Sequence, residues 1–146
     1  MAVEIRPFLR RHLDRVVAIE RLCFAHDAYP AELFLDLYRE NGELFFVARR
    51  SRRIVGYCVS SATGAEAEVI SLAVVPEHRG AGVGRALMRH TMTRLKRRRV
   101  CTLALMVRPE NQDALHLYRR LGFRVAGRIP RYYEDHSDGL LMRKRL

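Results

Sequence analysis

The sequence predicts a single mixed α/β (α+β) domain, in which a mostly antiparallel central sheet of about seven strands is flanked by about four helices. Apolar residues alternate at period two in some segments and recur at helical spacing in others, so strands and helices follow one another along the chain. A glycine-rich stretch separates one such strand from one such helix. The 146 residues, 49% of them hydrophobic, suffice for one core, and the domain is expected to span 1–146.

The first part of the chain predicts a short strand and two helices. Residues 3–6 alternate between apolar and charged types, as a strand does. Apolar residues then recur at helical spacing over 10–24. A second helix is expected to begin after Tyr29-Pro30, because proline suits the first helical turn, and to end at Asn41-Gly42.

Three strands are expected next. Residues 44–48 and 54–60 are largely apolar and are joined by a short charged turn, which indicates an antiparallel hairpin. Residues 68–75 predict a further strand that ends at Pro76, because proline cannot continue a strand ladder.

The second half alternates between the two patterns. Helical spacing returns over 83–95, and 100–107 is an apolar run typical of a strand buried on both faces. A helix capped by Asn111 or Asp113 and ending at Gly122 follows. The chain closes with two strands, 123–129 and 140–145. The predicted order is therefore β-α-α-β-β-β-α-β-α-β-β, which requires a mixed sheet.

Composition excludes several classes of protein. The three cysteines are widely separated and form no C-x-x-C pair, which indicates neither a disulfide framework nor a metal site. No apolar run approaches the ~20 residues of a membrane span, and the N-terminal residues lack a secretory signal, so a cytoplasmic protein is expected. The net charge of +11 has two interpretations: a surface that meets a polyanion, or arginines scattered over turns and helix ends.

The most informative stretch is Arg79-Gly80-Ala81-Gly82-Val83-Gly84-Arg85, which lies between a predicted strand and a predicted helix. Glycines allow a sharp turn, and a helix N-terminus offers unpaired amides and a positive dipole end to phosphate oxygens. A P-loop is excluded because Arg85-Ala86 stands where Lys-Ser/Thr is needed, and a dinucleotide fingerprint is excluded because its third glycine is replaced. Phosphate binding by another kind of loop is therefore expected.

Read as R-x-x-G-x-G, this stretch resembles the pyrophosphate loop of the GNAT superfamily of acyl-CoA-dependent N-acetyltransferases. The segment from Val107 to Phe123 is similar to that superfamily's V-R-x-x-N-x-x-A-x-x-L-Y-x-x-x-G-F signature. Residues 132–139 resemble a Y-Y-x-x-x-x-D-G segment of one branch. That branch holds the ribosomal-protein alanine N-acetyltransferases and the archaeal and eukaryotic catalytic subunits for protein N-terminal acetylation.

The resemblance implies a GNAT fold and a site for acetyl-CoA, with no metal. Backbone groups of the strand at Leu72, Ala73 and Val74 would bind the pantetheine arm. Asn111 would contact the cofactor at the head of the following helix. The pyrophosphate would lie over the loop formed by Arg79, Gly80, Ala81, Gly82, Val83, Gly84 and Arg85.

The resemblance also implies catalytic roles. Tyr118 would be the general acid beside the sulfur, because a leaving thiolate with an intrinsic pKa near ~8.5 departs more easily when it is protonated. The amide of Val74 would stabilise the oxyanion. The branch's bacterial members usually carry Glu where this chain has Met106. Asp27 matches an acidic position of archaeal members and is the preferred base or amine-orienting group.

Weaker candidates for the base are three further titratable residues, His116, His136 and Glu134. A missing base favours an α-amine as the acceptor. An α-amino group of pKa ~7.7–8.0 is roughly one-tenth neutral at pH 7, whereas a lysine of pKa ~10.4 is neutral in about one molecule in a few thousand.

The expected function is direct transfer of acetyl from acetyl-CoA to the N-terminal α-amine of a protein, such as a ribosomal protein. Tyr29, Tyr132 and Tyr133 align with branch tyrosines that line the peptide groove. Nucleic acid is not expected as a substrate, no membrane partner is expected, and the sequence leaves the oligomeric state open. Two alternatives remain: acetylation of a small-molecule amine or a protein lysine, and a non-catalytic module that binds acetyl-CoA or nucleic acid.

Overall fold

The computed structural model describes residues 2–146 and confirms the predicted order of elements. The predicted domain, 1–146, also includes Met1, which lies outside the described residues. The elements are β1 (Glu4–Pro7), α1 (Leu13–Phe24), α2 (Ala31–Asn41), β2 (Phe45–Arg50), β3 (Arg53–Thr63), β4 (Glu66–Val74), α3 (Val83–Arg97), β5 (Thr102–Val107), α4 (Gln112–Arg120), β6 (Arg124–Ile129) and β7 (Gly139–Arg145).

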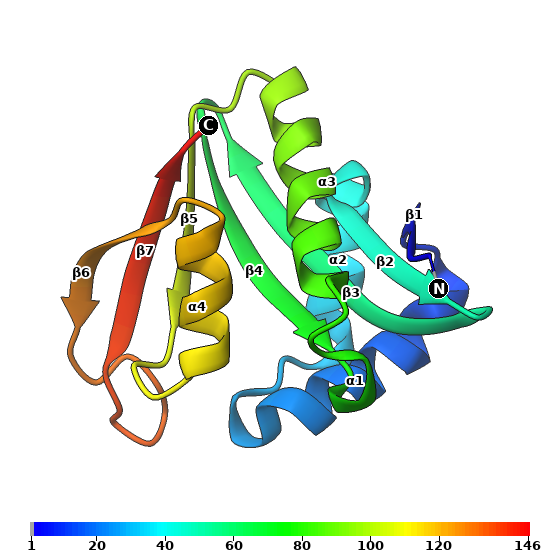
Figure 1. Cartoon of the computed structure of the whole chain (residues 1–146), viewed down its shortest axis with the longest axis horizontal. Coiled ribbons are helices and arrows are strands. Elements are labelled where there is room, and N and C mark those ends of the chain that lie inside the picture. Colours follow the sequence, from blue (N-terminus) through cyan, green and yellow to red (C-terminus); the bar gives the residue numbers. More distant parts are fainter. Residues whose placement is uncertain (1) are drawn as a thin grey trace.

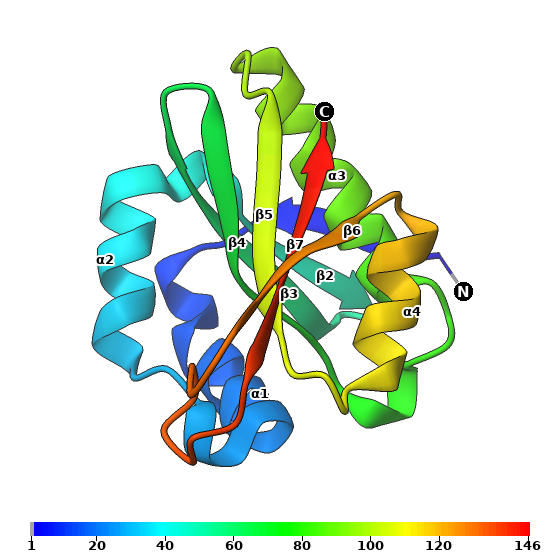
Figure 2. The same ribbon diagram turned by 90° about the vertical axis from the view of Figure 1, so that its left-hand side faces the viewer.

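One mixed sheet of seven strands organises the molecule, in the order β1-β2-β3-β4-β5-β7-β6 (Figures 1 and 2). Each neighbouring pair is antiparallel except β4 and β5, which run parallel. The predicted mixed, mostly antiparallel sheet with four helices is therefore confirmed. The hairpin of β2 and β3 is also confirmed, with the pairs running from Phe45–Val59 to Arg50–Arg53.

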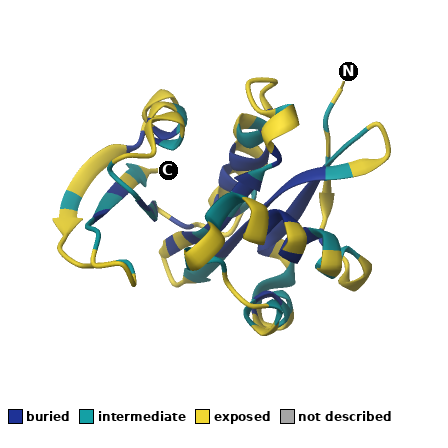
Figure 3. Cartoon of the chain, turned by 90° about the horizontal axis from the view of Figure 1, so that it is seen from below, coloured by how far each residue is buried: buried dark blue, intermediate teal, exposed yellow. Residues whose placement is uncertain are grey.

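The helices cover both faces of the sheet. On β3, Tyr57 contacts Phe34 of α2, whereas the next residue, Cys58, accepts a hydrogen bond from Thr91 of α3. Successive strand residues point to opposite faces, so α1 and α2 cover one face and α3 covers the other. The core lies between these layers and the sheet, where the ribbon is buried in Figure 3. Within residues 2–146, no helix has the length and hydropathy to cross a membrane.

Several predicted boundaries differ from the structure by two or three residues, and two of these differences have a clear local reason. Residues Arg10–His12 form a 3-10 turn, and the α-helix begins at Leu13. The Nδ1 atom of His12 accepts the Leu9 amide at 3.0 Å, which stabilises the tighter turn ahead of the helix. The strand expected over 100–107 begins at Thr102, because the amide of Val100 still bonds to Leu95 at the end of α3.

β4 and β5 pair over only three positions and then part. Their parallel register joins Glu66 to Thr102, Ala67 to Leu103 and Glu68 to Ala104. Beyond these pairs the two strands diverge, as Figure 1 shows, while each keeps its antiparallel partner on the other side. The facing backbone edges of β4 and β5 are therefore left open to a ligand.

A β-bulge interrupts β4 where this opening begins. Val59 of β3 pairs with Ser71, but the next residue, Ser60, pairs with Val69, so Ile70 is an extra residue in β4. Such a bulge changes the face to which the following side chains point.

Candidate active site

Two cavities meet at the opening between β4 and β5. The larger has a volume of about 900 Å³ and lies on the side of α3 and α4, and the smaller, of about 590 Å³, lies on the side of α1. Five residues line both: Phe24, Leu72, Asn111, Ala114 and Tyr118. Two ligands bound in these cavities would therefore face each other across the opening, beside Tyr118.

The glycine loop forms one end of the larger cavity. Gly80 and Gly82 have φ of +79° and +83°, the left-handed region that favours glycine. Gly82 is the N-cap of α3, and the amide of Ala86 makes the first intrahelical bond, to the Gly82 carbonyl at 3.0 Å. The amides of residues 83–85 precede that bond, so they are free of helical partners and suited to anionic oxygens.

Gly84 serves a different purpose from the other two glycines. A Cβ at this position would lie 3.2 Å from Leu117 of α4 and 3.8 Å from Val74 of β4. The absence of a side chain at Gly84 therefore lets α3 approach both elements closely. This contact fixes where the N-terminus of α3 lies relative to the open edge of β4.

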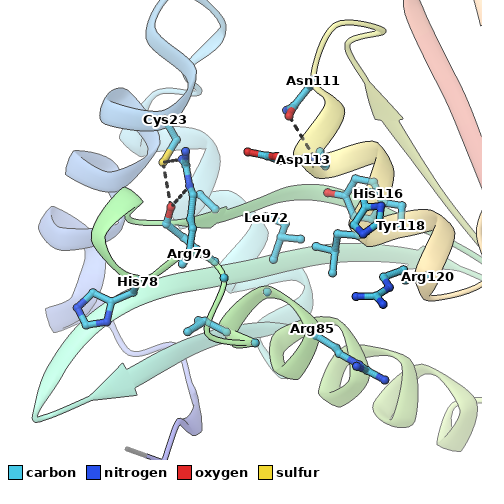
Figure 4. A pocket seen from close by; sticks show the side chains of 18 of the residues that line it. Cys23, Leu72, His78, Arg79, Arg85, Asn111, Asp113, His116, Tyr118 and Arg120 are labelled. Carbon is cyan, nitrogen blue, oxygen red and sulfur yellow. Dashed lines mark hydrogen bonds between the residues drawn. The ribbon is translucent and has the colours of Figure 1, made fainter.

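The predicted cofactor residues gather around this cavity, and all but Ala81 line it. Ala81 lies in the loop between two lining glycines. The side chain of Arg79 turns back into the protein, where Nε donates to the Val74 carbonyl at 3.0 Å and Nη2 to Cys23 Sγ at 3.3 Å (Figure 4). Arg79 thus supports the loop, whereas Arg85 extends along the cavity from the first turn of α3.

The open edge of β4 presents alternate backbone groups. The amide of Val75 bonds to the Val55 carbonyl at 2.9 Å, so the alternation of an antiparallel ladder also turns Ala73 toward β3. Leu72 and Val74 then direct their amides away from β3, into the opening. The Val74 carbonyl is bonded to Arg79, which leaves the Val74 amide as the group that faces a ligand there.

Tyr118 and Asn111 hold the junction from the side of α4. Asn111 caps the helix by accepting the Ala114 amide at 3.2 Å, and Tyr118 lies two turns further along. The ring of Tyr118 is 8% exposed and packs edge-on against Phe123. Burial raises the pKa of Tyr118 above its usual value, and the nearby Cys58 and Tyr133 contribute. The phenol therefore keeps its proton at neutral pH.

The smaller cavity contains the three tyrosines predicted for the acceptor groove. Tyr29 and Tyr132 are 37% and 44% exposed, and the rings of Tyr132 and Tyr133 meet edge-on at 4.9 Å. Burial, followed by the charge effect of Tyr132, raises the pKa of Tyr133 to about 12. All three phenols are therefore protonated hydrogen-bond donors at neutral pH.

Arg108 connects the walls of the smaller cavity. Its Nη2 and Nε atoms lie 2.7 and 2.8 Å from Asp27 Oδ2, and its Nη1 lies 3.1 Å from Asp135 Oδ2. Its guanidinium also stacks over the ring of Tyr133, 4.1 Å from the centroid. The sequence offered no signal for this role beyond the V-R of the signature, because the partners are distant in the chain.

Glu20 is a buried carboxylate that the sequence analysis did not single out. It is 1% exposed and accepts hydrogen bonds from the hydroxyls of Tyr57 and Ser71 and from the Tyr29 amide. The Ser71 and Tyr29 bonds are 2.7 and 3.0 Å long. Glu20 therefore joins α1 to β4 and to the loop of Tyr29.

The sequence analysis did not single out two further lining residues, Arg120 and Glu68. His116 and Arg120 reach the larger cavity from α4, and Figure 4 shows them beside Tyr118. Glu68 lines the smaller cavity at the last pair that β4 makes with β5. Met106 lines the same cavity, with its thioether beside Tyr132 and Gly139. The candidate bases His116 and Glu134 line the larger and the smaller cavity, respectively.

Comparison with known proteins identifies relatives over the whole length of the chain. The Acetyltransferase (GNAT) family matches residues 13–123. An uncharacterized N-acetyltransferase of Methanocaldococcus jannaschii is 37% identical, over 97% of this chain and 90% of its own length. An N-alpha-acetyltransferase of Sulfurisphaera tokodaii is 29% identical, over 89% of this chain and 85% of its own length.

Two solved structures also resemble this chain over nearly its whole length. Ard1 from Thermoplasma volcanium has a TM-score of 0.94 and 31% identity, with 100% of this chain and 99% of that chain covered. The ribosomal-protein-S18-alanine N-acetyltransferase from Escherichia coli has a TM-score of 0.87 and 28% identity, with 99% of this chain and 94% of that chain covered. The fold, the glycine loop and the two cavities therefore occur in a chain that resembles acetyltransferases from end to end.

Proposed function

The chain belongs to the GNAT acetyltransferase family and is an N-acetyltransferase, and from this membership we propose that it acetylates the N-terminal α-amine of a protein. The observation that carries the proposal is the meeting of two cavities beside Tyr118 at the opening between β4 and β5. One cavity suits a large anionic donor, and the other is walled by tyrosines. The names of the relatives, which include N-alpha-acetyltransferase, support this acceptor.

The larger cavity fits acetyl-CoA in size and chemistry. Its loop offers the free amides at the start of α3, and Arg85 and Arg120 add positive charge along its length. The open edge at Leu72 and Val74 can accept an extended pantetheine arm as a strand edge accepts a peptide. When bound, acetyl-CoA supplies the acetyl group as a thioester.

The chain's own residues would act on the reaction in three ways. The amide of Val74 points into the opening and would donate to the carbonyl oxygen on which negative charge develops. The protonated phenol of Tyr118 would donate its proton to the leaving sulfur. Tyr29, Tyr132 and Tyr133 would bind the acceptor's backbone, and Asn111 would hold the head of α4 against the donor.

Asp27 lies in the smaller cavity, but its Oδ2 atom is bound to Arg108. This pairing favours the amine-orienting role over that of a base, because the guanidinium compensates the carboxylate's charge. We propose that Asp27 and Arg108 together hold the loop of Tyr29 against the segment between β6 and β7. The entrance of the acceptor cavity is thereby fixed in width.

The N-terminus of a protein fits the smaller cavity better than a small amine. Its wall is built from phenols on separate segments, and these can bond to successive peptide groups of an extended chain. A ribosomal protein is one candidate acceptor, since the Escherichia coli relative is named for such a protein. The cytoplasmic location stays a prediction of the sequence.

A steady-state assay tests the proposed acceptor. The purified chain and acetyl-CoA are offered peptides with free N-termini, the same peptides with a blocked N-terminus and an internal lysine, and a panel of polyamines. We expect turnover of the free N-termini and at most trace turnover of the others. Turnover of blocked peptides or polyamines alone would refute the proposed acceptor. Mass spectrometry of cellular N-termini with and without the gene then identifies the acceptor proteins.

A further inference from the structure

A group of basic side chains covers the end of the sheet that lies away from the active site. We call this surface the basic end, and it comprises Lys96, Arg97, Arg98, Arg99, Arg124, Arg143, Lys144 and Arg145. All of them are exposed except Lys144, which is partly exposed. The sequence has no acidic residue over 79–109, 114–133 or 139–146, so each segment that builds this end carries positive charge alone.

The strands place three of these arginines on one face of the sheet. Arg143 of β7 pairs directly with Arg124 of β6. Arg145 is two residues further along β7, so its side chain shares the face of Arg143. Like charges directly opposite each other on neighbouring strands are destabilising. The pair of Arg124 and Arg143 therefore costs stability in the free protein, and a bound anion would offset that cost.

The turn after α3 adds its charges to the same end. The amide of Leu146 bonds to the Cys101 carbonyl at 2.8 Å, and Arg145 pairs with Thr102. These contacts hold the end of β7 beside the turn of residues 98–101. Figure 1 shows the C-terminus near the end of α3, at the opposite end of the sheet from the glycine loop.

Only part of this charge has a reason within the fold. Lys96 and Arg97 lie in the last turn of α3, where a cation interacts favourably with the helix dipole. The arginines of β6 and β7 lie on strands, where no such dipole acts. Within residues 2–146, none of the eight side chains takes part in an ion pair. Along the sheet, the nearest acidic residues are Glu66 and Glu68 of β4, two strands away from β7.

The composition of the basic end indicates a phosphate polyanion as its partner. All but two of its residues are arginines, whose planar forks match phosphate oxygens. Among the described residues, Val125 is the only exposed large apolar residue that adjoins it in sequence, so it offers little for insertion into a membrane surface. The exposed tyrosines, Tyr29 and Tyr132, belong to the acceptor cavity, so the basic end lacks the aromatic platforms on which single-stranded bases stack. A nucleic-acid duplex fits these properties best.

The shape of the basic end favours RNA over DNA. Helix α3 ends there rather than lying across it, and the neighbouring hairpin of β3 and β4 carries glutamates near its turn. Over residues 2–146, this end thus presents no basic helix to the major groove, where DNA sequence is read. An RNA duplex is recognised mostly by its shape and by contacts to its backbone.

We propose that the basic end binds the phosphate backbone of double-stranded RNA, as a partner and not as a substrate. The arginines contact phosphates without reading the base sequence, because backbone contacts carry no direct sequence information. The inference goes beyond the proposed function and does not depend on the identity of the acetyl acceptor.

The active site stays accessible when RNA is bound. β5 runs from Thr102 at the basic end to Val107 at the acceptor cavity, a length of about 17 Å. The basic residues of the donor cavity, which include Arg85 and Arg120, are separate from the basic end. RNA and CoA should therefore bind at the same time.

Fluorescence anisotropy of a labelled RNA duplex of about 20 base pairs, titrated with the purified chain at about 50 to 200 mM salt, tests the proposal. For roughly five phosphate contacts, we expect log K to fall against log salt with a slope of about −4 to −5. The variant Arg124→Gln/Arg143→Gln/Arg145→Gln should bind at least about tenfold more weakly at the lowest salt. Its slope should be shallower by about three, or one per lost phosphate contact.

The matched control is Arg10→Gln/Arg11→Gln/Arg21→Gln. It removes the same charge from exposed residues of α1 and of the turn before it, and it should bind RNA as the wild type does. A second variant, Lys96→Gln/Arg97→Gln/Arg98→Gln, changes the basic end without touching the strands and should also weaken binding. Thermal denaturation of the strand variant should show no loss of stability, because the repulsion between residues 124 and 143 is removed.

Four outcomes would overturn the proposal. The first is no binding of the RNA duplex by the wild type, and the second is equal weakening in the control and in the two variants of the basic end, which would indicate attraction by net charge alone. The third is tighter binding of a DNA duplex of the same sequence, of single-stranded RNA or of phosphatidylserine vesicles, since each is a different partner. The fourth is displacement of RNA by saturating CoA, which would place the RNA in the donor cavity.

Discussion

Arg108 and Asp27 form an ion pair between residues 81 positions apart, with two guanidinium nitrogens 2.7 and 2.8 Å from one carboxylate oxygen. The pair joins the loop after α1 to the end of β5. Asp135 binds the same guanidinium from the segment between β6 and β7. Hydrogen bonds from Ser137, and then from Arg108, lower the pKa of Asp135 to about 2. The three segments around the acceptor cavity therefore share one cation.

Asp27→Asn should therefore impair acceptor binding more than chemistry. The amide keeps the size of the side chain but removes its charge, and a partly exposed ion pair of this kind contributes about 1 kcal/mol. We expect KM for a peptide acceptor to rise about fivefold with kcat changed less. Steady-state kinetics measure both, and Asp36→Asn, in an exposed pair on α2, is the control. A fall in kcat at unchanged KM would contradict the positioning role and indicate a base.

Tyr118→Phe should slow catalysis while leaving donor binding intact. The ring keeps its packing against Phe123, but the proton donor beside the leaving sulfur is lost. We expect kcat to fall on the order of 100-fold or more. Calorimetric titration with CoA should give an affinity within about threefold of the wild type, or ~0.7 kcal/mol. Tyr38→Phe, in a residue that lines neither cavity, should change neither quantity, and an unchanged kcat in Tyr118→Phe would remove Tyr118 from the mechanism.

Gly82→Ala should cost both stability and donor affinity. Its φ of +83° is strained for alanine, by about 1–2 kcal/mol, although a Cβ there meets no protein atom within 4 Å. Gly82 lines the larger cavity and directly precedes the free amides at the start of α3, so we expect the added methyl group to crowd an anion bound there.

Gly64→Ala is the matched control for this prediction. Gly64 also has a positive φ, +60°, and open space for a Cβ, but it lies in the turn between β3 and β4. Thermal denaturation should show a similar loss of stability in both variants. Only Gly82→Ala should weaken binding of CoA, and equal affinities would show that the glycine loop does not hold the diphosphate.

The free energy of unfolding should decrease on acidification below about pH 6.5. Burial is the first cause that lowers the pKa of His12 and of His90, and neighbouring arginines lower both further. The unfolded chain therefore takes up these protons at a higher pH than the folded one. The neutral rings therefore stabilise the fold at a pH above the pKa that the two histidines have in the unfolded chain. This stabilisation is lost as the pH falls toward the lower pKa values that they have in the folded chain.

Melting temperatures measured between pH 7.5 and 5 test this prediction. The double variant His12→Asn/His90→Gln should show a weaker dependence on pH, since Asn can still accept the Leu9 amide without titrating. A wild-type melting temperature that rises on acidification would contradict the prediction.

The sequence predicted those features that depend on local chain geometry. The element order followed from local periodicity, and Gly80 and Gly82 were recognisable because a left-handed backbone conformation is a property of single residues. Gly84 was predicted as part of the same loop, although its reason is a contact with Leu117 on another helix. Patterns along one segment cannot show such contacts.

The missed site residues depend on pairing between distant segments. Strict alternation would assign Glu68 to the wrong face, because only the register with β3 reveals the extra residue at Ile70. Glu20 is one of several charged residues of α1, and its buried position becomes evident only when Tyr57 and Ser71 are placed beside it. The roles of Tyr118 and Asn111 were found through the resemblance, and the structure brings both residues to one cavity with the glycine loop.

The parting of β4 and β5 has a kinetic consequence. The two reactants approach from opposite sides of one sheet, so neither blocks the route of the other, and both can be present together before any bond changes. The two products, CoA and the acetylated acceptor, can likewise leave from opposite sides. Such an arrangement requires no acyl-enzyme stage, and initial velocities measured against both reactants should give intersecting rather than parallel reciprocal plots.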